Sequence, residues 1–232
     1  MIPITKRLLA CADLIPPGAR VADIGCDHGY LGIYLLHEKR AVSVIASDLR
    51  EKPLESAKQN ARQFGITNMD FVCADGLTGI DPDSVDTIVC AGMGGDLIRM
   101  VLEASPWALH GRHTLILQPQ SSQYELRLWL AENGFTIDRE TPVADCGHLY
   151  SVMRLRYIGK PVVLTPVEAY ISREILESGS EDLPAFLNDT VRRLEQATEN
   201  MKNAKQPPER LQFFETALEG TREVRNRYAD GT

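Results

Sequence analysis

A glycine-rich turn near the N-terminus has carboxylates where a nucleotide-binding loop usually has small, uncharged residues. The stretch VADIGCDHGYLGIYL, residues 21–35, contains Asp23, Gly25, Asp27 and Gly29 at alternate positions. In a dinucleotide-binding loop, the pattern GxGxxG lets the backbone approach a pyrophosphate at a helix N-terminus. Because a carboxylate at position 27 would repel a pyrophosphate, the turn indicates a positively charged ligand.

S-adenosylmethionine is a ligand of that kind, since its methionine end carries an ammonium and its reacting centre is a sulfonium. Asp23 and Asp27 suit both positive charges. Aspartate also tolerates the left-handed backbone conformation that such a turn can require. We therefore expect this cofactor to be bound by the residues of the turn, which are Asp23, Gly25, Cys26, Asp27 and Gly29.

Two more carboxylates follow the next two apolar runs. Asp48 ends AVSVIASD, 25 residues after Asp23, and Asp75 follows MDFVCA. In α/β nucleotide folds an acid at the end of the second strand accepts hydrogen bonds from ribose hydroxyls. A side chain after the third strand can reach an adenine edge. We expect Asp48, Leu49, Asp75 and Gly76 to complete the cofactor site; the alternative for each acid alone is a helix N-cap.

The elements that must position these residues follow an α/β rhythm. From residue 21 to residue 133, apolar β-branched runs alternate with helical periodicity, which predicts a parallel sheet covered on both faces. After Asn133-Gly134, the runs FTIDRE and LYSVMRLRY follow without a helix between them. They predict an antiparallel hairpin at one edge of the sheet. Methyltransferase sheets add such a hairpin to the dinucleotide-binding fold.

The C-terminal part has a different pattern. GKPVVLTP, residues 159–166, is typical of a linker, and Thr165-Pro-Val-Glu168 predicts a helix start. Two amphipathic stretches, separated by Gln206-Pro207-Pro208, predict a helical hairpin. The first has an apolar stripe at Leu183, Leu187, Val191, Leu194 and Met201, and the second has a weaker stripe at Leu211, Phe214, Leu218, Arg225 and Tyr228. We expect a Rossmann-like methyltransferase unit over residues 1–158 and a small helical, coiled-coil-like domain over residues 159–232. That helical domain either packs on the core or on another subunit, or serves as a substrate arm.

Composition narrows the cellular setting. The 232 residues carry a net charge of −7, but residues 1–62 have 9 Lys/Arg against 7 Asp/Glu. The five cysteines, with no CxxC pair, indicate neither disulfides nor a metal site, and we expect buried thiols in a reducing cytoplasm. No run approaches the roughly 20 apolar residues of a membrane span, and the N-terminal apolar run is too broken for a secretory signal.

Longer stretches of the chain resemble a known family. They are DIGCDHGYLGIYL, SDLREKPLESAKQN, VCADGL, IVCAGMGG and LILQPQ, with ITKRLLACADLIPPG before them and WLAENGFTI after them. Over nearly all of residues 3–157 the sequence is similar to the bacterial tRNA (adenine-22-N1)-methyltransferases. The resemblance implies a class I methyltransferase fold, S-adenosylmethionine as methyl donor, and N1 of an adenosine in the tRNA D-arm as acceptor. Members also share a helical, coiled-coil-like C-terminal domain.

The acceptor side of the sequence agrees with this chemistry. Enzymes that methylate exocyclic amines commonly have an (Asn/Asp/Ser)-Pro-Pro-aromatic motif after the fourth strand, whereas this chain has Ala91-Gly92-Met93-Gly94-Gly95. Ring N1 of adenine has an in-plane lone pair and can attack the sulfonium methyl without a general base. Catalysis is then mainly positioning, which supplies roughly 7 to 11 kcal/mol when the reactants are aligned. A nearby carboxylate would favour the cationic product.

Three residues are candidates for catalysis. Asp27 stabilises the developing charge or binds only the cofactor, and His28 hydrogen-bonds the base, orients Asp27 or is structural. Gln118 offers a donor and an acceptor to the adenine edge, or it caps backbone groups at the end of its strand.

The glycine loop and the N-terminal helix supply the remaining candidates. We assign Ala91, Gly92 and Met93 to the cofactor and Gly94 and Gly95 to the RNA, although these glycines would also suit a tight strand-to-helix turn. Since N1 is a pairing atom, the adenosine must be unpaired or extruded, at a cost of a few kcal/mol. Lys6 and Arg7 are the first candidates for phosphate contacts.

Three other readings of the sequence stay open. A methyltransferase acting on a small molecule would use the same cofactor turn with a different acceptor pocket. A non-catalytic protein that binds S-adenosylmethionine and RNA would also fit. A nicotinamide-dependent oxidoreductase is disfavoured because Asp27 occupies the approach of a pyrophosphate. The sequence does not predict an oligomeric state.

Overall fold

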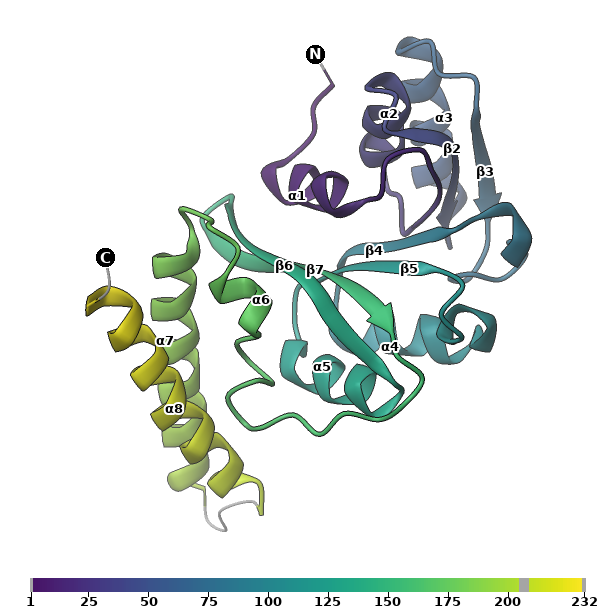
Figure 1. Ribbon diagram of the computed structural model, residues 1–232. Coiled ribbons are helices and arrows are strands. Elements are labelled where there is room, and N and C mark those ends of the chain that lie inside the picture. Colours follow the sequence, from purple (N-terminus) through teal and green to yellow (C-terminus); the bar gives the residue numbers. More distant parts are fainter. Residues whose placement is uncertain (1, 205–208, 231–232) are drawn as a thin grey trace.

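The alternating pattern folds into a seven-stranded sheet with helices on both faces in the computed structural model (Figure 1), which describes residues 2–204 and 209–230. The strand order is β3-β2-β1-β4-β5-β7-β6. The strands are β1 (Ala19–Ile24), β2 (Ala41–Asp48), β3 (Met69–Cys73), β4 (Thr87–Met93), β5 (Thr114–Pro119), β6 (Phe135–Asp145) and β7 (His148–Tyr157). The first five are parallel, and β7 runs antiparallel to β5 and β6. The predicted fold class, with its antiparallel last hairpin, is confirmed.

Helices cover the two faces in two groups (Figure 1). One group is α1 (Lys6–Leu14), α2 (Tyr30–His37) and α3 (Glu51–Gln63); the other is α4 (Gly95–Glu103) and α5 (Gln123–Glu132), with short 3-10 turns at Pro82–Ser84 and Pro106–Leu109. Successive strand residues point to opposite faces. Accordingly Val89 joins the apolar cluster under the first group, whereas Ile88 joins the cluster under the second. Burial on both faces explains why the central strands are continuous apolar runs.

A buried ion pair ties the second helical face to the edge hairpin. The Arg127 guanidinium on α5 donates to the Glu140 carboxylate on β6, and both side chains are almost fully buried. The hydroxyl of Ser172 also donates to Glu140, at 2.6 Å, and caps α6 (Arg173–Leu176) by accepting from the N–H of Ile175. One carboxylate thus fixes three elements.

The C-terminal helices α7 (Leu183–Lys202) and α8 (Leu211–Asp230) pack side by side beyond the hairpin (Figure 1). The Asp182 carboxylate anchors the start of α7 by accepting from the N–H of Ala144 at 2.8 Å. The predicted apolar stripe of α7 is buried at Leu183, Leu187, Val191 and Leu194. The Gln206-Pro207-Pro208 break lies outside the described residues.

On α8 the predicted stripe is partly wrong. Phe214 is buried and Leu218 is half-buried against the same cluster, as expected; Arg225 is only half-buried, and the fully buried positions are Ala217 and Thr221. Small side chains at these two positions leave room for α7, which hydropathy alone does not reveal. No helix among residues 2–204 and 209–230 is both long and apolar enough to cross a membrane.

Two local predictions need correction. The Thr165–Glu168 capping box forms, with the Glu168 carboxylate accepting from the N–H of Thr165 at 2.8 Å, but it closes one turn rather than a helix. Cys11, Cys26 and Cys90 are buried as predicted, whereas Cys73 and Cys146 are exposed. Cys73 ends an edge strand and Cys146 lies in the β6–β7 turn, so both are open to solvent.

Candidate active site

A cleft of about 430 Å³ opens at the carboxyl ends of β1, β2, β3 and β4. This is the edge at which open α/β sheets bind ligands. Many of the residues predicted from the sequence line it, namely Gly25, Asp27, Asp48, Leu49, Asp75, Gly76, Ala91, Gly92 and Met93, together with Arg7. Segments up to about ninety residues apart in the chain therefore meet around one hollow.

The glycine turn owes its shape to left-handed backbone conformations. Gly25 and Gly29 have φ angles of 70° and 72°, and Asp27 between them has φ of 50°. The carbonyl oxygen of Ser47 on β2 accepts from the N–H groups of Gly25 and Cys26, at 2.8 and 3.0 Å. The turn is thus held to β2, and the Asp27 side chain, 70% exposed, is presented at the cleft.

Asp23 lies beneath this turn rather than in the cleft lining. Its side chain is buried, and its Oδ2 atom has no hydrogen-bond partner among the described residues. Burial, followed by the repulsion of the Asp48 carboxylate, raises the pKa of Asp23 to about 7. When it is ionised, a buried carboxylate without a full set of hydrogen-bond partners attracts a cation that binds nearby.

Asp48 is held in place at the cleft wall. Its Oδ1 atom accepts from the N–H of Arg50 at 3.0 Å, and its side chain is 9% exposed. Ser47, beside it, donates its hydroxyl to the carbonyl oxygen of Gly76 at 3.1 Å. This bond ties the end of β2 to the loop after β3, and Ser47 is a cleft residue that no sequence pattern indicated.

Two exposed leucines flank the cleft. Leu49 is 67% exposed and Leu97, in the first turn of α4, is 48% exposed. Large apolar side chains left in solvent at a cleft indicate a surface that a ligand covers. The sequence predicted Leu49 but not Leu97, because Leu97 fits the ordinary apolar periodicity of an amphipathic helix.

Gln118 connects the glycine loop to the N-terminal helix. Its side chain is fully buried, and its Oε1 atom accepts from the N–H of Gly92 at 3.0 Å and from Nη1 of Arg7 at 3.2 Å. Arg7 in turn lies 3.9 Å from Asp145 on the edge hairpin. The structure thus uses the Gln118 oxygen inside the protein, and no direct contact of Gln118 with an adenine edge follows from this geometry.

Gly94 and Gly95 lie next to the start of α5 and do not line the cleft. The N–H of Gly95 donates to the carbonyl oxygen of Ser121 at 2.9 Å. A Cβ at position 95 would lie 2.5 Å from the carbonyl oxygen of Ser122, which is backbone and cannot give way. Glycine is therefore required there for a close approach of two loops.

The other predicted residues lie around the cleft or away from it. His28 is half exposed, with Nε2 3.8 Å from Asp27 Oδ2 and its ring 5.8 Å from that of Tyr30. Cys26 is buried in the turn, and Gly29 starts α2. Lys6, adjacent to Arg7, is exposed at a separate shallow hollow formed with Thr141. Within residues 2–204 and 209–230, no three His, Cys, Asp or Glu side chains are grouped to hold a metal ion.

The sequence that forms this cleft matches a known protein family. A family described as "Methyltransferase domain" matches residues 4–153, a segment that contains every residue of the cleft. The chain belongs to this methyltransferase family. The cleft at the carboxyl ends of its first four strands is therefore the candidate active site of a methyltransferase domain.

Individual relatives of this methyltransferase agree in sequence. The tRNA (adenine(22)-N(1))-methyltransferase of Bacillus subtilis is 36% identical over 153 residues. That alignment covers 66% of this chain and 64% of the relative, so the chain spans less than two thirds of the relative's length. The predicted resemblance to the bacterial tRNA (adenine-22-N1)-methyltransferases is confirmed.

Solved structures extend the similarity over nearly the whole methyltransferase. The crystal structure of the Bacillus subtilis m1A22 tRNA methyltransferase gives a TM-score of 0.77 at 25% identity and covers 99% of both chains. Sp1610 of Streptococcus pneumoniae, a proposed tRNA (m1A22) methyltransferase solved in complex with S-adenosyl-L-methionine, gives a TM-score of 0.80 at 29% identity. It covers 95% of this chain and 99% of that one. The C-terminal helices therefore belong to the shared architecture.

Proposed function

We propose that this chain is a cytoplasmic tRNA methyltransferase that uses S-adenosylmethionine to methylate N1 of adenosine 22 in the D-arm. The observation that carries the proposal is the left-handed turn that presents the Asp27 carboxylate at the cleft, above the buried Asp23. Negative charge at this turn suits a cationic methyl donor and opposes a pyrophosphate. The names of the relatives described above support tRNA as the acceptor.

The cleft residues fit the donor group by group. Asp27 and Asp23 would supply the negative field for its ammonium, and Asp48 would supply acceptors for its ribose hydroxyls. Leu49 and Leu97 offer apolar surface for its adenine ring, and Asp75 offers an acceptor for the adenine amine. When bound, S-adenosylmethionine supplies an electrophilic methyl group.

The chain's own contribution to the reaction is positioning and charge. Gly92 lines the cleft, where an adenine ring would approach the backbone, and Gln118 holds this part of the loop through the N–H of Gly92. No proton has to be removed from N1, so no general base is needed. Asp27 favours the positive charge that develops on the base.

We also propose residues 1–158 as the methyltransferase unit and residues 159–232 as the helical unit.

Nucleoside analysis tests this function. Purified protein is incubated with unmodified tRNA and methyl-labelled donor, and the RNA is digested to nucleosides; we expect the label in 1-methyladenosine. A tRNA with guanosine at position 22 should accept none. Label at N6 of adenine or on guanine would contradict the proposal, and an unlabelled digest would favour a binding protein without turnover.

Salt dependence distinguishes an RNA substrate from a small molecule. Methyl transfer to tRNA should fall steeply as ionic strength rises, because phosphate contacts release counterions. Turnover that is insensitive to salt would favour a neutral metabolite as acceptor. Titration with NADH is the control for the oxidoreductase alternative and should show no binding.

A further inference from the structure

A second cavity lies between the start of α5 and the C-terminal helices. Its volume is about 250 Å³, and it is lined by Ser121, Tyr124 and Glu125 on one side and by Tyr170, Arg193 and Phe214 on the other. It shares no lining residue with the cofactor cleft. Drug-sized ligands occupy pockets of about 300–1,000 Å³, so this cavity suits a smaller ring system.

Aromatic rings form much of the cavity wall. Tyr124 stacks on Tyr170 with ring centroids 5.1 Å apart, and Phe214 meets Tyr124 edge-on at 5.4 Å. The Arg210 guanidinium lies 5.8 Å from the Phe214 centroid, and its Nη1 atom donates to the Tyr124 hydroxyl at 3.4 Å. Aromatic and guanidinium planes of this kind are the surfaces on which proteins stack unpaired nucleobases.

Two buried oxygens at the cavity have no partner. Glu125 Oε2 and the Tyr170 hydroxyl are inaccessible to solvent, and neither makes a hydrogen bond to any described residue. Burial raises the pKa of Tyr170, so its hydroxyl remains a donor at neutral pH. Unsatisfied buried polar groups are rare and call for an explanation. Both side chains line the cavity, so a ligand that enters it lies next to these polar residues.

The cavity adjoins the acceptor side of the active site through Ser121. The carbonyl oxygen of Ser121 accepts from the N–H of Gly95, and its hydroxyl lies so close to Gly94 that a Cβ there would be 2.8 Å away. Ser121 therefore lies between the glycine loop and the cavity, which are neighbours in the structure.

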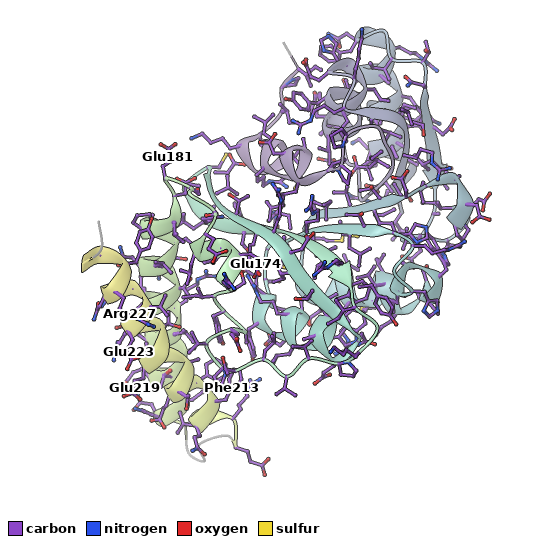
Figure 2. The ribbon with its side chains drawn as sticks, viewed as in Figure 1. Glu174, Glu181, Phe213, Glu219, Glu223 and Arg227 are labelled. Atoms are coloured by element: carbon purple, nitrogen blue, oxygen red, sulfur yellow. The ribbon has the colours of Figure 1, made fainter. Side chains whose placement is uncertain are left out.

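The charged side chains of the C-terminal helices differ between their outer side and the side that forms the cavity. Figure 2 shows Glu219, Glu223 and Arg227 along the side of α8 that faces away from the sheet, and all three are exposed. Residues 159–232 carry 10 Lys/Arg against 13 Asp/Glu, so the helical pair is not a basic surface as a whole. Arg193 lines the cavity, where it pairs with Asp189, and Arg210 lies next to the cavity, so two guanidinium groups flank the cavity.

We propose that this cavity, the flanking-base pocket, receives an unpaired base that lies within two nucleotides of the target adenosine. The inference rests on the proposed RNA substrate and names a second contact to it. The base stacks on the aromatic wall and lies beside the Tyr170 and Glu125 side chains. Such a contact would hold the RNA in register while the adenosine is extruded.

Filling the pocket tests the proposal. Ala197→Phe places a ring into the cavity from the half-exposed side of α7, and Glu125→Gln removes the carboxylate while keeping its size. We expect Ala197→Phe to raise the Kd for tRNA about 10-fold, the loss typical of one stacked base. The Kd for S-adenosylmethionine should stay within twofold. A filled variant with the wild-type Kd for tRNA overturns the proposal.

Abasic tRNAs identify the base. One base at a time is removed from the two nucleotides on each side of the target adenosine. One abasic tRNA should bind the wild-type protein about 10-fold more weakly than intact tRNA, with no further loss in Ala197→Phe. If every abasic tRNA binds the wild-type protein as intact tRNA does, the pocket takes no flanking base. If Ala197→Phe does not fold, the binding of intact and abasic tRNAs is compared between the wild-type protein and Glu125→Gln instead, with the same outcomes for the proposal.

Two adjacent arginines give a matched control. Arg192 and Arg193 both pair with Asp189 on the exposed surface of α7, but only Arg193 lines the pocket. Arg193→Ala should weaken tRNA binding by more than Arg192→Ala, and equal losses would indicate general phosphate attraction instead. The proposed function fails separately, if the wild-type protein forms no 1-methyladenosine in tRNA.

Discussion

Gln118 Oε1 lies 3.2 Å from Nη1 of Arg7, although 111 residues separate the two positions in the chain. The same oxygen accepts the N–H of Gly92, so one buried side chain joins the N-terminal helix, β5 and the glycine loop. We interpret Gln118 as a positioning residue that fixes the glycine loop at the edge of the candidate active site.

Replacing this oxygen should therefore slow turnover. Gln118→Leu leaves the Gly92 N–H and the Arg7 guanidinium without an acceptor, and an unsatisfied buried group costs about 1–3 kcal/mol. We expect kcat to fall at least about 10-fold while the Kd for S-adenosylmethionine changes less. Gln118→Glu keeps an acceptor for both donors and should recover most of kcat. The control is Gln63→Leu at the exposed end of α3; a Gln118→Leu enzyme with normal kcat would refute the role.

Donor binding should depend on pH through Asp23. Because burial and the Asp48 carboxylate raise the pKa of Asp23 to about 7, the acid is mostly protonated at pH 5.5 and half ionised at pH 7. A cationic donor prefers the ionised form, so its affinity should rise about tenfold over this range, with release of a proton. Calorimetry in two buffers of different ionisation enthalpy measures both effects. The affinity of Asp23→Asn for the donor should not change with pH over this range. If the affinity of the wild-type protein is equally independent of pH, Asp23 does not contribute to donor binding.

The raised pKa of Asp23 should make the stability of the free protein fall as the pH rises, whereas the affinity for the donor rises. Between pH 4 and about 7 the folded state holds a proton on Asp23 that the unfolded chain releases. The contribution of Asp23 to stability is therefore present below pH 4 and is lost as the pH rises through 7. Thermal unfolding should show a smaller decline from pH 5 to pH 8 in Asp23→Asn than in the wild-type protein. Parallel declines in the two proteins would contradict the raised pKa.

Two neighbouring glycines should respond differently to alanine. At Gly95 the added Cβ would meet the carbonyl oxygens of Ser121 and Ser122, whereas at Gly94 it meets only the Ser121 hydroxyl, which can rotate. Overpacking costs about 1–3 kcal/mol, which lowers Tm by roughly 2–12 °C in a chain of this size. We expect that loss in Gly95→Ala and little change in Gly94→Ala. Equal Tm values for the two variants would show that the loops are not in close contact.

The buried Arg127–Glu140 pair should dominate the stability of the hairpin junction. Glu140→Leu leaves the buried Arg127 guanidinium without its carboxylate and the Ser172 hydroxyl without its acceptor. We expect a loss of about 3–5 kcal/mol in the free energy of unfolding. The double variant Arg127→Met, Glu140→Leu should regain most of this. Glu177→Gln, which breaks the exposed pair with Arg173, is the control and should be nearly neutral. Urea unfolding of the four proteins checks the order, and a double variant no better than Glu140→Leu would contradict it.

The sequence predicted the parts of the site that depend on local pattern. Apolar runs and turn residues place Asp48, Asp75 and the Gly25–Gly29 turn at strand ends, and strand ends of a parallel sheet converge without further information. The left-handed conformation of Asp27 was also predictable, because few residues other than glycine tolerate it. The edge hairpin followed from the missing helix between two strands.

The features that the sequence did not reveal depend on contacts between distant segments. Gln118 and Arg7 meet only after five strands are assembled, so each was assigned a separate role toward RNA. Leu97 has the periodicity of a core residue, and only its exposure at the cleft distinguishes it. The wall formed by Tyr124 and Tyr170 brings together two residues from segments that hydropathy treats as unrelated.

The left-handed φ of Asp27 also limits how the turn can evolve. Asparagine adopts the same conformation readily, so a single exchange removes the charge and leaves the loop intact. Valine or isoleucine would lose the charge and distort the backbone together. An asparagine at this position therefore isolates what the carboxylate alone contributes, and a natural lineage that gave up the reaction could keep the folded turn by that route.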